Sequence, residues 1–216
     1  MTPATASLLV PLPVLLPLLG AALTVIGARS ALLQRAVGIV VLTAMSGVAA
    51  LLLVVAHQTG PVVAQPGGWP APVGIALVAD RLSALLLLVS TLVTLAVLVY
   101  AIDQRIADYG RGTASTTFHP MYLMLSAGVS LAYLTGDLFT LFVAFEIMLT
   151  ASYVLITRRT SAEKIRAGMT YVTVSLLSSL LFLTAIGLVY AATGTVNLAE
   201  LADRVALLPP GLATVL

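Results

Sequence analysis

The sequence predicts an all-α integral membrane protein. Of its 216 residues, 60% are hydrophobic and 8% are charged, whereas soluble domains carry roughly 25% charged residues. Such a chain has too few polar side chains to cover a surface that faces water. Long apolar runs can cross a bilayer only as helices or as closed barrels, because both satisfy the backbone hydrogen bonds internally. The runs in this chain do not alternate as barrel strands do, which leaves helices.

Six apolar runs predict about six transmembrane helices. A helix needs roughly 20 apolar residues to cross the hydrocarbon core. The runs that come close to this length are 7–27, 36–56, 81–102, 119–135, 137–157 and 167–192. The first run has no basic segment before it, so it is interpreted as a retained span and not as a signal peptide. Pro11, Pro13 and Pro17 predict that this first helix is kinked or starts late.

The basic residues predict the orientation of the spans. Eight of the ten lie in the connections that follow the first, third and fifth spans: Arg29, Arg35, Arg105, Arg111, Arg158, Arg159, Lys164 and Arg166. Arg81 and Arg204 lie on the other side. By the positive-inside rule the eight face the cytoplasm, and both termini of this segment lie outside.

The connection 57–80 is the one sizeable loop that the spans predict on the outer side. Its PGGWPAP stretch indicates turns, and VGIALVAD is expected to form a short strand at the membrane interface. Trp69 suits the headgroup zone. Residues 1–216 are expected to form a single polytopic domain. The last residues, LLPPGLATVL, break off inside an apolar run, so the chain is interpreted as a fragment of a longer one.

The composition argues against several kinds of site. Because cysteine is absent, there is no disulfide, thiolate metal site or thiol catalysis. His57 and His119 lie at the ends of apolar runs and predict no metal cluster. The basic residues are scattered over loops and form no face for nucleic acid. We therefore expect a protein surrounded by lipid, without cofactor, metal or nucleic-acid partner.

One acidic residue, Glu146, lies near the middle of a predicted span. A carboxylate at the centre of a transmembrane helix costs roughly 2.5–3.5 kcal/mol on insertion scales, and such residues often mark proton relays. The other charged residues near spans, Asp80, Asp103 and Asp137, lie at span ends, where water or headgroups are expected to reach them. The alternative for Glu146 is a protonated side chain that hydrogen-bonds across a helix interface as structural glue. Either Glu146 works alone or its cationic partner lies outside these residues.

Hydroxyl groups near Glu146 are candidates for a polar path. Thr150 and Tyr153 follow Glu146 at helical spacing, toward the predicted cytoplasmic end. The last span carries further hydroxyls, among them Ser175, Ser178 and Ser179. The alternative for the serines is close helix packing, which small residues permit. Four more small residues are packing candidates for the same reason: Gly38, Gly47, Ser126 and Gly128.

The stretch HPMYLMLSAGVSLAYLTGDLFTLFVAFEIMLTASYVLI, residues 119–156, resembles the antiporter-like subunits of multisubunit (Mrp-type) sodium/proton antiporters, the D subunit most closely. The same family includes the proton-pumping membrane subunits of respiratory complex I and of membrane-bound hydrogenases. TGDLFxLFVxFE is the most specific pattern, and GGWPAP followed by VADRLSALLLL, within residues 67–88, is a second landmark. The resemblance covers nearly the whole chain but only the N-terminal part of the family's fold of roughly fourteen helices.

The resemblance implies a function and a role for Glu146. It implies a subunit of a bacterial membrane antiporter that exchanges a monovalent cation, sodium, for protons together with other membrane subunits. Glu146 is then the carboxylate that translocates protons, paired with a lysine beyond residue 216. The alternative within the family is a proton-pumping subunit of a complex I-like NADH-quinone oxidoreductase or a membrane-bound hydrogenase. A third reading is a structural membrane scaffold without a proton role.

Overall fold

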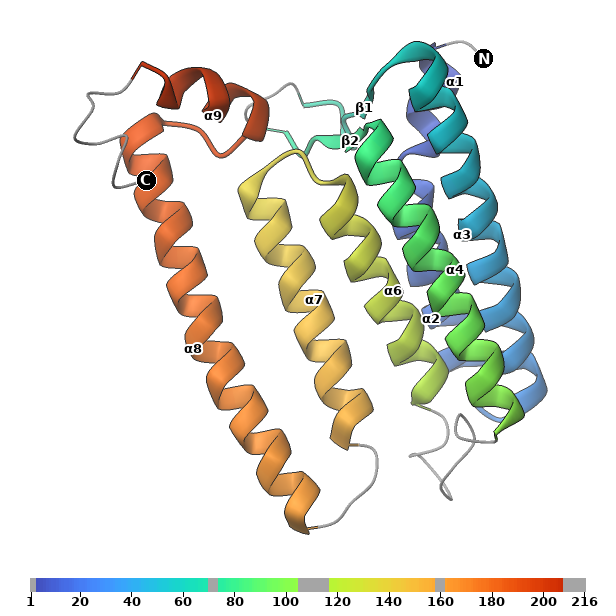
Figure 1. The fold of residues 1–216 in the computed structure, drawn as a ribbon. Coiled ribbons are helices and arrows are strands. Elements are labelled where there is room, and N and C mark those ends of the chain that lie inside the picture. Colours follow the sequence, from blue (N-terminus) through green and yellow to red (C-terminus); the bar gives the residue numbers. More distant parts are fainter. Residues whose placement is uncertain (1–2, 70–73, 105–116, 158–161, 208–216) are drawn as a thin grey trace.

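The computed structural model describes residues 3–69, 74–104, 117–157 and 162–207 (Figure 1). Within these ranges the helices are α1 (Pro3–Leu9), α2 (Leu12–Ile26), α3 (Ala31–Thr59), α4 (Arg81–Asp103), α6 (Phe118–Leu134), α7 (Leu138–Thr157), α8 (Ala162–Thr193) and α9 (Leu198–Val205). The strands are β1 (Val62–Ala64) and β2 (Leu77–Ala79). The all-α membrane fold that the sequence predicts is confirmed.

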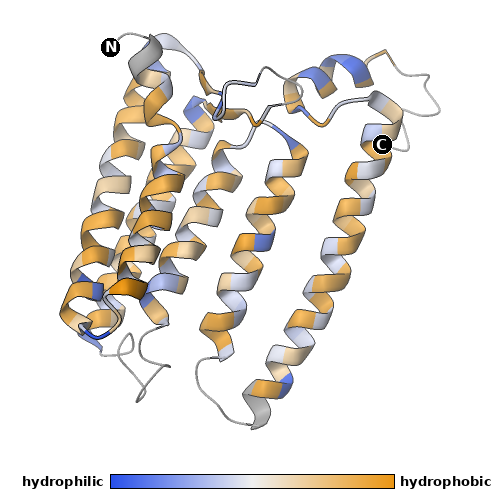
Figure 2. Cartoon of the chain, turned by 180° about the vertical axis from the view of Figure 1, so that it is seen from behind, coloured by the Kyte–Doolittle hydropathy of each residue, from blue (hydrophilic) through white to orange (hydrophobic). Residues whose placement is uncertain are grey.

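Each predicted span corresponds to helical structure in the described part of the chain. Five segments are long and apolar enough to cross a membrane: Ala6–Ile26, Ala31–Thr59, Arg81–Asp103, Leu138–Thr157 and Ile165–Thr193. The remaining predicted span, 119–135, is α6, which has 17 residues and is shorter than the others. Figure 2 shows the helices mainly in hydrophobic colours along their length, with hydrophilic colours common at their ends and on α9.

The first predicted span is interrupted, as its prolines predict. Helix α1 ends at Leu9, and α2 begins at Leu12 with Pro11 at its N-cap. A proline has no backbone N–H to donate and disfavours a helical conformation in the residue before it. Pro17 lies inside α2 without ending it. The break therefore falls at the earlier proline and divides the span into a short and a long helix.

The helices form a bundle with one helix at its edge. Helix α3 packs against α2 and α4, α6 packs against α2 and α7, and α8 packs against α7. Val10, Leu52 and Leu87 belong to one buried cluster, and Leu42 and Leu98 belong to a second one. Helix α8 stands at the edge of the row (Figure 1), and only 6% of its apolar stretch is buried.

The connection 57–80 contains the predicted strand. β2 lies within VGIALVAD and pairs antiparallel with β1, with Val63 opposite Val78. Gly67 and Gly68 have positive φ angles, which is consistent with the predicted turns. Residues 70–72 of PGGWPAP lie outside the described residues. The side chain of Trp69 is exposed, and its position at the headgroups stays a prediction.

Two of the four small packing candidates lie in helix contacts, and a third is buried. A β-carbon added to Gly38 would lie 3.0 Å from Leu98, and one added to Gly128 would lie 2.7 Å from Met148. Ser126 is buried in α6 and donates its hydroxyl to a backbone carbonyl of its own helix. The interpretation of Gly47 was wrong, because nothing lies within 4 Å of a β-carbon there.

Candidate functional site

Glu146 lies on α7 and faces α8. The side chain is half-buried, and its carboxylate oxygen Oε1 accepts a hydrogen bond from the hydroxyl of Ser179 on α8. The sequence did not assign a partner to Glu146 within this chain. The structure therefore adds a neutral donor from the adjacent helix to the isolated carboxylate that the sequence predicts.

A cavity of about 240 Å³ lies between α7 and α8 beside Glu146. Its polar lining consists of Glu146, Thr150, Tyr153, Tyr171, Ser175 and Ser179, and Leu149, Val172 and Leu176 complete it. Residues three or four apart share a face of a helix, so each helix turns its hydroxyls toward the same gap. Four of the five hydroxyl residues that the sequence singled out are thus brought together with Glu146.

Ser178 is the predicted hydroxyl that does not line this cavity. One residue along an α-helix rotates the side chain by about 100°, so Ser178 and Ser179 cannot face the same neighbour. The Ser178 hydroxyl donates to the carbonyl of Val174 on its own helix at 2.9 Å, and its side chain is exposed.

The cavity has room for water and for a proton donor. Its volume compares with about 30 Å³ for each molecule of liquid water. Glu146 is the one carboxylate among the described lining residues, and no Lys, Arg or His lines the cavity in the described part of the chain. Hydroxyls and water both donate and accept hydrogen bonds. The arrangement can therefore carry a proton to or from a single carboxylate.

Aromatic rings close the contact between α7 and α8 on the other side of Glu146. The ring of Phe182 lies 6.1 Å from that of Phe142 and 5.8 Å from that of Phe145, measured between centroids. Phe142 lies one turn before Glu146 on α7, whereas Thr150 lies one turn after it. The carboxylate thus stands between an apolar contact toward the start of α7 and a polar cavity toward its end.

The expectation for Asp137 was wrong. Its side chain is 6% exposed and does not lie open to water or headgroups. Oδ1 accepts the backbone N–H of Thr140 at 2.6 Å, so Asp137 caps the start of α7, and within the described residues Oδ2 has no hydrogen-bond partner. The cause of burial is tertiary, because the segments around Ala76 and Asn197 both contact the turn between α6 and α7.

The TGD turn, residues 135–137 between α6 and α7, explains part of the TGDLFxLFVxFE pattern. Gly136 donates its N–H to Ala76 at 2.7 Å, and its carbonyl accepts the N–H of Leu198 at 2.9 Å. A β-carbon on Gly136 would lie 3.1 Å from the carbonyl oxygen of Ala76. A glycine is therefore needed where the segment next to β2 approaches the start of α7.

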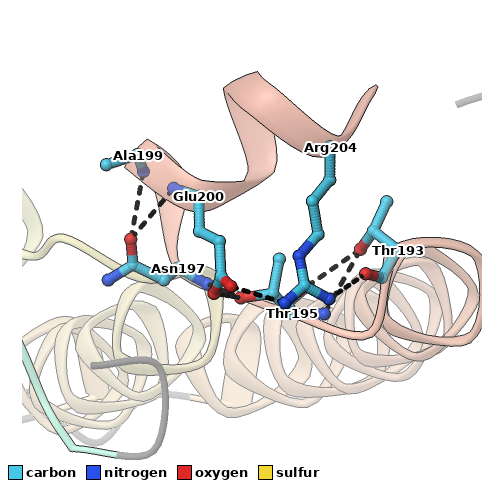
Figure 3. Close-up of polar contacts among 6 residues, drawn as sticks. All are labelled: Thr193, Thr195, Asn197, Ala199, Glu200 and Arg204. Atoms are coloured by element: carbon cyan, nitrogen blue, oxygen red, sulfur yellow. Dashed lines mark hydrogen bonds and ion pairs between the residues drawn. The ribbon is translucent and has the colours of Figure 1, made fainter. Parts of the chain in front are cut away.

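Sequence reasoning missed a polar cluster that joins α8 to α9 (Figure 3). Arg204 pairs with Glu200 at 2.5 Å and donates to the carbonyl of Thr193 at 2.6 Å. The Thr195 hydroxyl donates to Glu200 at 2.7 Å, and Asn197 caps α9. The hydrogen bond from Thr195, together with Arg204, lowers the pKa of Glu200 below its usual 4.5. Two features of the sequence point to this helix: an Asn at the cap, and a Glu–Arg pair four residues apart.

A family model described as "NADH:quinone oxidoreductase/Mrp antiporter, TM" matches residues 135–213. This range holds the TGD turn, Glu146 with the cavity between α7 and α8, and α9. Residues 135–213 of the chain match this family. The resemblance that TGDLFxLFVxFE predicts is thereby confirmed.

Curated relatives of this family are antiporter subunits. The chain is 41% identical over 205 residues to a probable K(+)/H(+) antiporter D subunit of Rhizobium meliloti, covering 92% of this chain and 37% of that protein. It is 36% identical over 197 residues to the Na(+)/H(+) antiporter D subunit of Alkalihalophilus pseudofirmus, covering 91% and 39%. The chain thus spans less than two fifths of the length of these relatives.

Two solved structures share the fold. A chain of the Mrp complex from Dietzia sp. is 33% identical, with a TM-score of 0.77, covering 93% of this chain and 39% of that one. A chain of the archaeal membrane-bound sulfane sulfur reductase is 28% identical, with a TM-score of 0.81, covering 98% and 42%. Both comparisons agree with a multi-pass membrane subunit of the antiporter and complex I-like family.

Proposed function

We propose that this chain is part of a subunit of a multisubunit monovalent cation/proton antiporter in which protons pass through Glu146. The observation that supports this most directly is the hydroxyl-lined cavity between α7 and α8, with Glu146 on its wall. A structural glutamate needs one donor across the interface. It does not need a further cavity lined by Thr150, Tyr153 and Ser175. The cavity therefore favours a role of Glu146 in proton transfer over a purely structural role.

In the proposed mechanism the carboxylate of Glu146 takes up a proton and later gives it back. Water and hydroxyls in the cavity deliver the proton on the side of Thr150 and Tyr153. The rings of Phe142, Phe145 and Phe182 offer no hydrogen bond, so they oppose proton leakage on the other side. As the resemblance implies, a lysine outside these residues pairs with Glu146 in one state and leaves it in another. The proton binds when that cation is away, because an adjacent positive charge favours the ionised carboxylate.

The partners in this proposal are other membrane subunits, together with protons and sodium. Support for contacts with such subunits comes from α8, whose large apolar side chains are mostly exposed, among them Leu177, Leu181 and Leu188. The named relatives include one potassium/proton and one sodium/proton antiporter component. The choice of sodium is therefore tested separately, by driving exchange in turn with each ion.

The proposed location is the bacterial cytoplasmic membrane, with both termini of this segment outside. The hairpin of β1 and β2 lies at the same end of the bundle as α9 (Figure 1). The turn between α2 and α3, which carries Arg29, and the start of α8 lie at the opposite end. This arrangement supports a common side for the connections that are rich in arginine.

The test replaces Glu146 in the complete complex. Glu146→Gln keeps the shape and removes the titration, so exchange should be lost while the complex still assembles. Glu146→Asp should retain partial activity, because the carboxyl remains about one methylene further from its partners. Asp203→Asn, an exposed carboxyl-to-amide change on α9, is the matched control. Exchange is followed by a pH-sensitive dye in inverted vesicles, and wild-type exchange by an assembled Gln variant would sink the proposal.

A proton-pumping subunit of a redox complex is the second candidate. It is favoured by the similarity to a chain of the sulfane sulfur reductase complex, and Glu146 would serve it in the same way. The two candidates differ in what drives proton movement. Proton transport by the purified complex that requires an electron donor supports the redox reading, whereas transport driven by a sodium gradient alone supports the antiporter.

A further inference from the structure

The hydroxyl of Ser179 behaves unlike its neighbours on α8. Five other hydroxyls of this helix donate to the carbonyl four residues earlier: Thr170, Thr173, Ser178, Thr184 and Thr193. This is the usual bond of a serine or threonine inside a helix. Ser179 instead donates across the interface to Glu146. Its hydroxyl is directed to the one carboxylate among the described residues of the cavity.

We propose that Ser179 is a positioning residue whose hydroxyl follows the charge state of Glu146, donating to the ionised carboxylate and turning to its own helix when Glu146 binds a proton. This inference rests on the proposed function, because it assumes that Glu146 titrates during transport. It adds a specific group that sets how strongly Glu146 holds its proton.

The hydrogen count of each state supports this exchange of partners. An ionised carboxylate only accepts hydrogen bonds, whereas a protonated one has an O–H to donate. Once Glu146 is protonated, its O–H donates to the Ser179 oxygen. The Ser179 hydrogen is then free to turn to the carbonyl of Ser175, four residues earlier, as in the five other α8 hydroxyls. The hydrogen bond between Glu146 and Ser179 is thus present in both states, and only the side chain that donates it changes.

Few other groups compete with Ser179 for control of Glu146. Tyr153 of α7 and Tyr171 of α8 are the other titratable side chains among the described lining residues. Helix α6 packs against the far side of α7, and its titratable residues do not line the cavity. Asp137 precedes Glu146 by nine residues, or about 13 Å along the helix axis. The hydrogen bond from Ser179 is therefore the nearest described influence on the carboxylate.

The test compares two substitutions of nearly equal shape in the complete complex. Ser179→Val removes the hydroxyl, and Ser179→Thr keeps it. The loss of a hydrogen bond to a carboxylate disfavours the ionised form of that carboxylate. The Val variant should therefore hold its proton more strongly, and its exchange profile should move by about one pH unit toward alkaline pH. The Thr variant should stay near the wild type. Ser178→Ala, one residue away with an exposed hydroxyl, should leave the profile unchanged.

Infrared difference spectroscopy provides a second readout that packing alone does not move. The carbonyl stretch of protonated Glu146, identified by its loss in Glu146→Gln, should shift in Ser179→Val because its O–H loses its acceptor. The same stretch should be unchanged in Ser178→Ala.

The outcomes separate the two proposals. If Glu146→Gln abolishes exchange but Ser179→Val and Ser179→Thr have the same pH profile and the same stretch, the role of Ser179 is refuted and the function stands. An equal shift in Ser178→Ala also refutes it, since any hydroxyl of α8 would then have the effect. If Glu146→Gln assembles and exchanges ions normally, the proposed function itself fails.

Discussion

A β-carbon on Gly128 of α6 would lie 3.1 Å from the backbone carbonyl oxygen of Ala144 on α7. The same β-carbon would lie 2.7 Å from the side chain of Met148. Ala144 and Met148 flank Glu146 on α7, so the contact with α6 holds the stretch of helix that carries the carboxylate. Backbone atoms cannot move aside as a flexible side chain can, and a larger residue at 128 must separate the two helices.

Gly128→Ala should therefore destabilise the protein even though alanine favours a helix. Overpacking of this kind costs roughly 1–3 kcal/mol. Gly47→Ala on α3 is the matched control, because nothing lies within 4 Å of its added β-carbon. Thermal unfolding of the two variants in detergent measures the difference. Equal midpoints for the two variants would contradict the close contact between α6 and α7.

Asp137 should act through its helix cap. Asp137→Asn keeps an oxygen that can accept the N–H of Thr140, whereas Asp137→Ala removes it. We expect the Ala variant to lose about 1 kcal/mol of stability and the Asn variant to lose less. Amide hydrogen exchange over the first turn of α7 should be faster in the Ala variant. Similar exchange in both variants would mean that the cap contributes little there.

The start of α4 should weaken in acid. The backbone N–H of Ser83 donates to Asp80 and, as the largest influence, lowers the pKa of this carboxyl below its usual 3.8. A lowered pKa means that the stabilisation is present above 3.8 and is lost as the pH falls through the folded-state value. Amide hydrogen exchange measures this effect. The protection factors in the first turn of α4, corrected for the intrinsic exchange rate at each pH, should fall over this acid range. Asp80→Asn should remove the pH dependence, and an unchanged slope in that variant would assign it to another group.

Glu200 should hold α9 against the end of α8. Glu200→Gln weakens the pair with Arg204 and the bond from Thr195, so α9 should become more mobile. A spin label at the exposed position Ala202 should report this increase, and Asp203→Asn should leave the label unchanged. Because the pKa of Glu200 is lowered, the wild type should show the same loosening only when acid protonates this carboxyl. Equal mobility of the label in Glu200→Gln and Asp203→Asn would mean that the pair of Glu200 with Arg204 does not hold α9 against α8.

The proposed orientation can be tested directly, because the chain has no cysteine of its own. Gln65 lies in the connection 57–80, where its side chain is exposed, and α8 begins at Ala162. An impermeant thiol reagent should label Gln65→Cys in intact cells. It should label Ala162→Cys only after permeabilisation. The reverse labelling pattern would mean that the chain has the opposite orientation in the membrane.

The sequence alone was sufficient for features that depend on composition along one helix. Each span is a run of apolar residues, and the cost of a charge in hydrocarbon makes Glu146 stand out without any knowledge of its neighbours. The break near Pro11 follows in the same way, since proline acts on its own backbone. The hydroxyls on the Glu146 helix were also predictable, because Thr150 and Tyr153 follow at helical spacing.

Only the tertiary structure decided which groups meet across helices. Ser179 contacts Glu146 and Ser178 does not, and this depends on the rotation of α8 about its axis, which its near-uniform apolar surface leaves open in the sequence. Asp137 is buried because segments about 60 residues away on either side cover it. Contacts of this kind depend on how helices pack in space, and no periodicity within a single helix encodes that packing.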